Sequence, residues 1–247
     1  MAERVTQLTR DQAKALKINR AIPGEKIRLL VFDLDGTLID SRLDLVHSVN
    51  AMLRHCNRPE LPDDVIATYV GDGAPMLVRR ALGDPEDVGF FQQALDYFLT
   101  YYRAHKLDYT HVYEGIVEAL GTIQASSNGS PRSLAVLSNK PVRPSRDIVE
   151  ALGLKRFFFE TYGGNSFPTK KPDPQGAIAL MNTAGANPEQ TLIVGDSCND
   201  VLTGRNAHTY TCGVTYGFAP HTLCDCPPDV VVDTPQEMAE LFTKVWV

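Results

Sequence analysis

Short runs of consecutive apolar residues recur along this chain of 247 residues, at positions 29–32, 134–137 and 192–194. Parallel strands that are covered by helices on both faces have this continuous pattern, because neither face of the sheet meets water. Stretches typical of helices lie between or beside these runs, at about 115–124, 143–152 and 175–184. This alternation predicts an α/β fold whose core is a Rossmann-like parallel sheet.

The pattern changes between Leu43 and about Leu107, where apolar residues recur at helical spacing without any strand signal. Prolines and glycines divide this segment into about four helices. We therefore expect an inserted α-helical cap domain, residues 43–108, between the two parts of an α/β catalytic core, residues 27–42 and 109–247. We expect the sheet to resume near Val112. Residues 1–26 form an N-terminal extension that either covers an edge of the core or pairs with another subunit.

Two carboxylates directly follow the first apolar run. Asp33 and Asp35 stand two residues apart, and Gly36 then ends the run. This places them at the carboxyl end of a central strand, which is where open α/β sheets bind their ligands. Carboxylates this close repel each other unless a cation lies between them, and a hard divalent ion such as Mg²⁺ suits their oxygen atoms. A plain turn is the alternative explanation, since Asp and Gly are common where strands stop.

Three further polar clusters occupy comparable places. Ser138 and Asn139 follow the second apolar run, and a hydroxyl there can donate a hydrogen bond to a phosphoryl oxygen. Lys171 precedes the helical stretch at 175–184, and Asp196 follows the third run with Asp200 four residues later. Each cluster alone is explained by an ordinary helix cap or turn. Together they supply an acid, a hydroxyl, a lysine and an acid in an order that a parallel sheet can bring together.

This set of four motifs resembles that of the haloacid dehalogenase superfamily of phosphoryl-transfer enzymes, over residues from about 28 to the C-terminus. The resemblance implies that Asp33 is the nucleophile and forms an aspartyl-phosphate. It implies that Asp35 acts as general acid and then as general base. Thr37 and Ser138 would hydrogen-bond the phosphoryl group, and Lys171 would neutralise its charge and orient the nucleophile.

The same resemblance implies a bound Mg²⁺ ion. Its ligands would be Asp33, the backbone carbonyl of Asp35, and Asp196, with Asp200 as a partner of Lys171 or of a bound water. In the dehalogenase branch of the superfamily a tyrosine stands where this chain has Asp35. Cleavage of a carbon–halogen bond is therefore disfavoured.

The cap segment carries one distinctive loop, Gly71-Asp72-Gly73, at the start of a predicted helix. Free backbone N–H groups at such a place can bind an anion, although a simple turn between helices has the same spacing. The loop is similar to the cap loop of phosphoglycolate phosphatases. Because 2-phosphoglycolate carries a carboxylate beside its phosphate, we expect Arg80, in preference to Arg79, to make a bidentate contact with it. Asn139 is counted with this loop among the substrate-binding residues.

The expected function is Mg²⁺-dependent hydrolysis of a small phosphorylated substrate, above all 2-phosphoglycolate. A β-phosphoglucomutase-like mutase or a pyrophosphatase of the same fold stays open, because fold and core motifs do not fix the substrate. A phosphonate hydrolase would need a cap lysine, and the only lysine between positions 43 and 107 is Lys106. A catalytically silent binding or scaffold protein is the alternative from another class, and four intact motifs disfavour it.

Composition bounds the partners. The net charge of −6 argues against a nucleic-acid partner, and no apolar stretch has the length of a membrane span. Residues 1–26 lack the apolar centre of a signal peptide, so we expect a cytoplasmic protein, either a monomer or a homodimer. The five cysteines, an odd number, do not resemble a disulfide framework, and Cys198 is expected to be a small buried residue.

Overall fold

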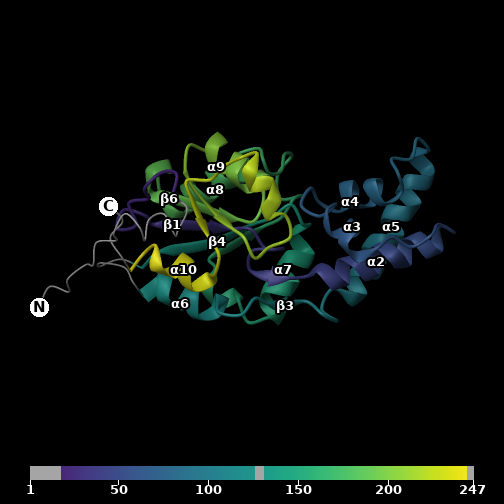
Figure 1. Ribbon diagram of the computed structural model, residues 1–247, viewed down its shortest axis with the longest axis horizontal. Helices are drawn as coiled ribbons and strands as arrows, with labels where there is room; N and C mark the ends of the chain where they lie inside the picture. Colours follow the sequence, from purple (N-terminus) through teal and green to yellow (C-terminus); the bar gives the residue numbers. More distant parts are fainter. Residues whose placement is uncertain (1–17, 126–130, 244–247) are drawn as a thin grey trace, which may run out of the picture.

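The computed structural model describes residues 18–125 and 131–243, so most of the predicted N-terminal extension lies outside the described residues. An α/β part and a purely helical part follow one another along the long axis of the molecule (Figure 1). Among the described helices, none is both long and apolar enough to cross a membrane.

A six-stranded sheet forms the centre of the α/β part, and all its strand pairs are parallel. The strand order is β5-β4-β1-β6-β7-β8. The bounds are β1 (Leu29–Phe32), β4 (Ser133–Leu137), β5 (Glu160–Tyr162), β6 (Thr191–Gly195), β7 (Tyr210–Val214) and β8 (Val230–Val232). All four residues of β1 are buried, as the continuous apolar pattern requires. The predicted Rossmann-like parallel sheet is confirmed, although β5 and β7 were not predicted as separate strands.

Helices cover both faces of the sheet (Figure 1). One face carries α6 (Ile116–Ala125), α7 (Val142–Ala151) and α10 (Pro235–Glu240), whose apolar side chains share one cluster with those of the strands. The other face carries α8 (Gln175–Ala184) and α9 (Cys198–Asn206). Single turns of 3₁₀ helix occur at η1 (Lys155–Phe157), η2 (Pro188–Gln190) and η3 (Pro220–Cys224). The parallel strands thus avoid water on both faces, which the sequence pattern predicted.

Four helices form the inserted helical part, α2 (Arg42–His55), α3 (Asp63–Ala67), α4 (Ala74–Ala81) and α5 (Val88–His105). Their inward side chains make a hydrophobic cluster of their own, centred on the packing of α2 against α5. Gly73 directly precedes α4, and its φ of 83° is a left-handed conformation that favours glycine. The side chain of Asp87 caps α5 by accepting a hydrogen bond from the backbone N–H of Phe90.

The two connections between the parts run beside each other. Strand β2 (Ile39–Asp40) pairs antiparallel with β3 (His111–Val112) in a separate two-stranded sheet. The expectation that the main sheet resumes near Val112 was therefore wrong, and the next strand of that sheet is β4. A short polar-apolar pair of residues carries too little pattern to show which strand it will join.

The described end of the predicted extension packs on the edge of the main sheet. Ile18 forms an isolated antiparallel bridge with Val230 of β8, and the backbone N–H of Asn19 donates to the carbonyl of Asp229. Ile22 is buried in the main cluster. These contacts shield the unpaired edge of β8, which would otherwise offer hydrogen-bonding groups to another chain.

Asp44 fastens the two connections together. It is 1% exposed, and its carboxylate accepts hydrogen bonds from the backbone N–H groups of Tyr109 and Thr110 and from the hydroxyl of Thr110. A buried carboxylate is stable here because several donors satisfy it at once.

We expect Asp44→Ala to lower the free energy of unfolding by about 1.5–3 kcal/mol, because buried N–H groups lose a charged acceptor. Urea unfolding measures the change. The control is Asp96→Ala on the exposed face of α5, which should stay within about 0.5 kcal/mol of the wild type. Equal stabilities of the two variants would contradict a fastening role for Asp44.

Candidate active site

The carboxyl end of β1 lies between the carboxyl ends of β4 and β6. Phe32 is in register with Val136 on one side and Val194 on the other. The residues that follow these strands, Asp33, Ser138 and Asp196, are therefore neighbours at one edge of the sheet. Strands β4 and β6 lie on opposite sides of β1, so the direction in which strands are added to the sheet reverses at β1. Such a switch point is the usual ligand position in open α/β sheets.

Lys171 joins two of the predicted acids. Its Nζ lies 2.9 Å from Asp33 Oδ1 and 2.6 Å from Asp200 Oδ1, and its side chain is 3% exposed. Burial lowers the pKa of Lys171, but the carboxylates of Asp200 and Asp33 outweigh burial and raise the pKa above its ordinary value. The lysine is therefore a permanent cation that fixes the direction of the Asp33 side chain.

Asp33, Asp196 and Asp200 form a cluster in which one oxygen of each lies within 4.8 Å of the others. Burial raises the pKa of Asp33 to about 6 and that of Asp196 to about 7. The neighbouring carboxylates raise both pKa values further, whereas Lys171 lowers that of Asp33. Asp196 is held by the backbone, because its Oδ2 accepts from the N–H groups of Phe218 and Ala219 at 2.6 Å and 3.0 Å.

The cluster fits a divalent cation. Lys171 neutralises one of its three carboxylates, so two negative charges remain when all three are ionised. Both oxygens of Asp200 are engaged, one by Lys171 and the other by the N–H and hydroxyl of Ser197. By contrast, Asp33 Oδ2 and Asp196 Oδ1 accept no hydrogen bond from any described residue. Two free carboxylate oxygens and an unbalanced charge of two are what a Mg²⁺ site provides.

The side chain of Asp35 turns to a different partner, Lys140. Lys140 Nζ lies 2.8 Å from both carboxylate oxygens, and Ser41 Oγ donates to one of them. The ammonium also lies 4.8 Å from the centre of the Tyr102 ring, on helix α5 of the cap. The sequence analysis missed Lys140, although it directly follows Asn139, because a lysine after a strand is most often an exposed residue.

The predicted phosphoryl-binding hydroxyls have different surroundings. The hydroxyl of Thr37 is completely buried and has no hydrogen-bond partner among the described residues. Such an orphaned group is costly unless a ligand or a water satisfies it. Ser138 lines the cavity beside Asp33. Asn139 also lines it, but its Nδ2 donates to the carbonyls of Gly71 and Lys171 and so ties the cap loop to the core.

The cap loop 71–73 is fastened to the core mainly through Asp72. Asn199 donates to Asp72 Oδ1 at 2.8 Å, and Lys170 Nζ donates to the Asp72 carbonyl at 2.6 Å. Arg80 pairs with Asp72 Oδ2 at 2.5 Å and also donates to the carbonyl of Tyr69. Burial raises the pKa of Asp72, but the hydrogen bonds from Asn199 and Arg80 outweigh it and lower the pKa.

This geometry does not place Arg80 where the sequence analysis expected it. Gly71 and Gly73 line the cavity, whereas neither Asp72 nor Arg80 does. The guanidinium of Arg80 already has a carboxylate partner in Asp72, so in this structure Arg80 stabilises the loop 71–73. The expectation assigned both Asp72 and Arg80 to the substrate, and the sequence alone did not show that the two side chains pair with each other.

A cavity of about 310 Å³ lies between cap and core, above Asp33. The cap contributes an apolar wall that includes Leu45, Leu77, Phe98 and Leu99. Two arginines also line the cavity, Arg103 from α5 and Arg143 from α7, and the sequence analysis had singled out neither. A cavity of this size, with a mostly apolar wall and a few polar groups, suits a small substrate.

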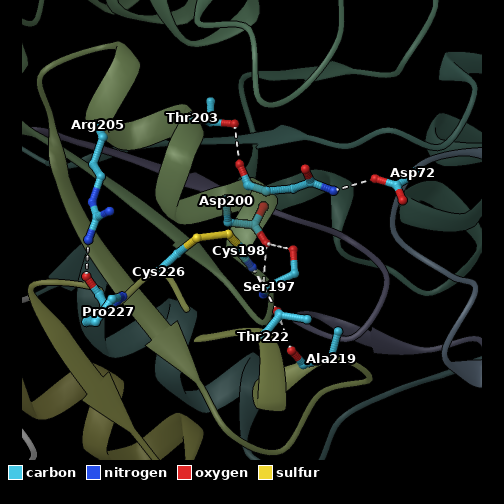
Figure 2. Close-up of a disulfide and its surroundings, with 11 residues drawn as sticks. Asp72, Ser197, Cys198, Asp200, Thr203, Arg205, Ala219, Thr222, Cys226 and Pro227 are labelled. Atoms are coloured by element: carbon cyan, nitrogen blue, oxygen red, sulfur yellow. Dashed lines mark hydrogen bonds between the residues drawn. A yellow bond between two sulfur atoms is a disulfide. The ribbon is translucent and has the colours of Figure 1, made fainter. Parts of the chain in front are cut away.

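A disulfide joins Cys198, the first residue of α9, to Cys226 in the segment before β8 (Figure 2). The expectation of a small buried Cys198 in a chain without a disulfide framework was therefore wrong, because Cys198 is bridged and only half-buried. The pairing joins residues 28 positions apart, and only the packing of η3 against α9 brings them together. Beside it, the N–H of Cys198 donates to Thr222, whose hydroxyl donates to the Ala219 carbonyl. The segment that holds Asp196 is thus anchored to α9.

Comparisons with known proteins agree with this geometry. The family model of haloacid dehalogenase-like hydrolases matches residues 30–214. A phosphoglycolate phosphatase of Haemophilus influenzae (strain 86-028NP) is 34% identical over 88% of this chain and 98% of its own length. The phosphoglycolate phosphatase of Pseudomonas putida is 38% identical over 85% of this chain and 78% of its own length.

Solved structures lead to the same family. The crystal structure of a protein from Haemophilus somnus 129pt, described as a predicted phosphoglycolate phosphatase, superposes with a TM-score of 0.81 and 30% identity, covering 87% of this chain and 98% of that one. The match to the family model spans β1, β4 and β6 and thus every strand that positions the acids. This chain belongs to the haloacid dehalogenase-like hydrolases and is a phosphatase of that family.

Proposed function

We propose that this phosphatase hydrolyses 2-phosphoglycolate to glycolate and phosphate, with Mg²⁺ as its metal and Asp33 as its nucleophile. The observation that carries the proposal is the setting of Asp33: Lys171 holds one of its oxygens and no described residue bonds the other. An oriented carboxylate with one free oxygen can attack phosphorus and form an aspartyl-phosphate. The relatives named above are phosphoglycolate phosphatases, which supports the choice of substrate.

The chain's own residues divide the work. The free hydroxyl of Thr37 and that of Ser138 donate to the phosphoryl oxygens, and Lys171 stabilises the charge that develops on them. Asp35 gives a proton to the leaving alkoxide and later removes one from the attacking water. Ser41 and Lys140 hold the Asp35 carboxylate in place for both steps.

The metal would be held by Asp33, the backbone carbonyl of Asp35, and Asp196, with Asp200 orienting Lys171. When bound, Mg²⁺ supplies positive charge that neutralises the acids and the transferring phosphoryl group. The protein contributes a rigid support, since two backbone N–H groups fix the Asp196 side chain from behind.

Asp33→Asn tests the nucleophile. The amide has the same shape but is a poor nucleophile, so turnover of 2-phosphoglycolate and of p-nitrophenyl phosphate should fall by more than about a hundredfold, which corresponds to several kcal/mol. Steady-state assays measure the loss, and thermal unfolding checks that the fold is kept. The matched control is Asp96→Asn on the surface of α5. Retention of more than about a hundredth of the wild-type rate would exclude Asp33 as nucleophile.

The pH dependence of Mg²⁺ binding tests the acidic cluster. In the metal-free protein the raised pKa values, about 6 for Asp33 and about 7 for Asp196, mean that the folded state binds more protons than the unfolded chain between about pH 4 and pH 7. This contribution to stability is therefore present at low pH and is lost as the pH rises through the folded-state pKa values. The metal needs the ionised forms, so protons compete with it at low pH.

We expect the dissociation constant of Mg²⁺ to be roughly a hundredfold or more higher at pH 5 than at pH 8. Isothermal titration calorimetry measures both constants. At pH 6, titrations in buffers of different ionisation enthalpy should show release of protons on binding. A dissociation constant that is the same at both pH values would show that the metal does not bind at these two acids.

Lys140→Met tests the support of Asp35. Removal of the ammonium leaves a nearly buried carboxylate unpaired, so the free energy of unfolding should fall by about 3–5 kcal/mol. In the double variant with Asp35→Asn the loss should be clearly smaller than the sum of the two single losses. The control is Lys155→Met, whose ion pair with Glu150 lies on the surface and contributes at most about 1 kcal/mol. Additive losses would mean that Lys140 and Asp35 do not support each other.

A further inference from the structure

The two arginines that line the cavity, Arg103 and Arg143, differ from nearby arginines in their ion pairing. Neither Arg103 nor Arg143 has a carboxylate within ion-pairing distance among the described residues, and both are exposed. Nearby arginines are paired instead, Arg79 with Asp84, Arg80 with Asp72 and Arg146 with Glu160. Two cations that line the cavity and have no carboxylate partner in the described part of the chain are available to a ligand.

The helices that carry these arginines are held together next to the cavity. Arg103 lies on α5, three residues before Lys106, and Arg143 lies on α7, four residues before Asp147. Lys106 Nζ and Asp147 Oδ2 form an ion pair of 3.3 Å. Residues three or four apart share a helix face, so this pair brings the two arginines onto neighbouring turns that face the same cavity. Like charges so placed repel each other until an anion binds between them.

The phosphate itself has other ligands. The end of the sheet offers it the hydroxyl of Ser138, which lines the cavity with Asp33, and the cation of Lys171, which pairs with Asp33. The buried hydroxyl of Thr37 has no partner among the described residues. Lys140, the remaining cation that lines the cavity close to the acids, is already engaged by Asp35. The two arginines are therefore free for a second anionic group on the same substrate.

We propose that Arg103 and Arg143 together bind the carboxylate of the substrate and select phosphate esters that carry a carboxylate close to the phosphate. This inference rests on the proposed function, which it refines by naming the residues that set specificity. Planar guanidinium groups recognise a carboxylate through paired N–H donors. One arginine comes from the cap and the other from the core, so the carboxylate would also connect the two parts across the cavity.

The test compares two ligands that differ only at the far end. 2-Phosphoglycolate carries a carboxylate, and 2-hydroxyethyl phosphate carries a hydroxymethyl group in its place. Both are measured as competitive inhibitors of p-nitrophenyl phosphate hydrolysis, which needs no turnover of either ligand. In Arg103→Gln and in Arg143→Gln we expect the inhibition constant of 2-phosphoglycolate to rise by about ten- to hundredfold, and that of 2-hydroxyethyl phosphate by less than about threefold.

Matched controls come from the same two helical regions. Arg146→Gln alters the same helix as Arg143, and Arg79→Gln alters the cap, and neither residue lines the cavity. Both should leave the two inhibition constants unchanged. Arg103→Lys and Arg143→Lys keep the charge, so they should recover part of the selectivity.

The outcomes separate this inference from the proposed function. Equal losses for both ligands in the glutamine variants would overturn the carboxylate subsite, and so would a selective loss confined to Arg80→Gln. A wild type that binds but does not hydrolyse 2-phosphoglycolate would overturn the proposed substrate. The ratio of inhibition constants would in that case still decide whether the arginines recognise a carboxylate.

Discussion

The bond between Lys171 and the acids beside β1 is the interaction on which the site depends. Burying Asp33, Asp196 and Asp200 within 4.8 Å of one another is costly unless cations compensate. Lys171 compensates one charge and orients two of the side chains at once. The third acid, Asp196, is packed directly against the backbone of two glycines. A Cβ atom on Gly36 would lie 2.4 Å from Asp196 Oδ2, and one on Gly217 would lie 2.3 Å from Asp196 Cβ.

The cap is joined to the same polar edge through the loop 71–73. Asn139, Lys170 and Asn199 each bond this loop, and they belong to the segments that follow β4, β5 and β6. The loop therefore lies on residues that belong to the same edge of the sheet as the acidic cluster. Movement of the cap would act directly on the active-site edge, since cap and core share these hydrogen bonds.

Local patterns allowed the prediction of the elements that position the acids. Continuous apolar runs identified β1, β4 and β6, and the helix at 175–184 was predicted with the bounds that α8 has. Strands β2, β5 and β7 were not predicted, and β3, which was expected near Val112, was assigned to the main sheet. In β2, β3 and β5, two or three residues carry no clear period. The motif acids, the serine and the lysine meet at one edge, as the order of the motifs predicted.

Residues that depend on partners distant in sequence could not be predicted in the same way. Lys140 became notable only through Asp35, which lies 105 positions away. The Cys198–Cys226 bridge likewise depends on how η3 packs against α9. For Arg80 the sequence showed both the cation and Asp72 in the glycine loop, but not that the two side chains pair with each other.

The pairing of charges in the cap leaves Arg80 engaged by Asp72 and thus not free for a ligand. Asp72 would place a negative charge near an anionic substrate, but Arg80 and Lys170 lie on either side of it and offset that charge. The loop can then approach the cavity with its glycines and little net charge. Arg103 and Arg143 line the cavity, and neither has a carboxylate partner among the described residues. The paired charges of Asp72 and Arg80 thus hold the cap loop, and the unpaired arginines Arg103 and Arg143 are available to a ligand.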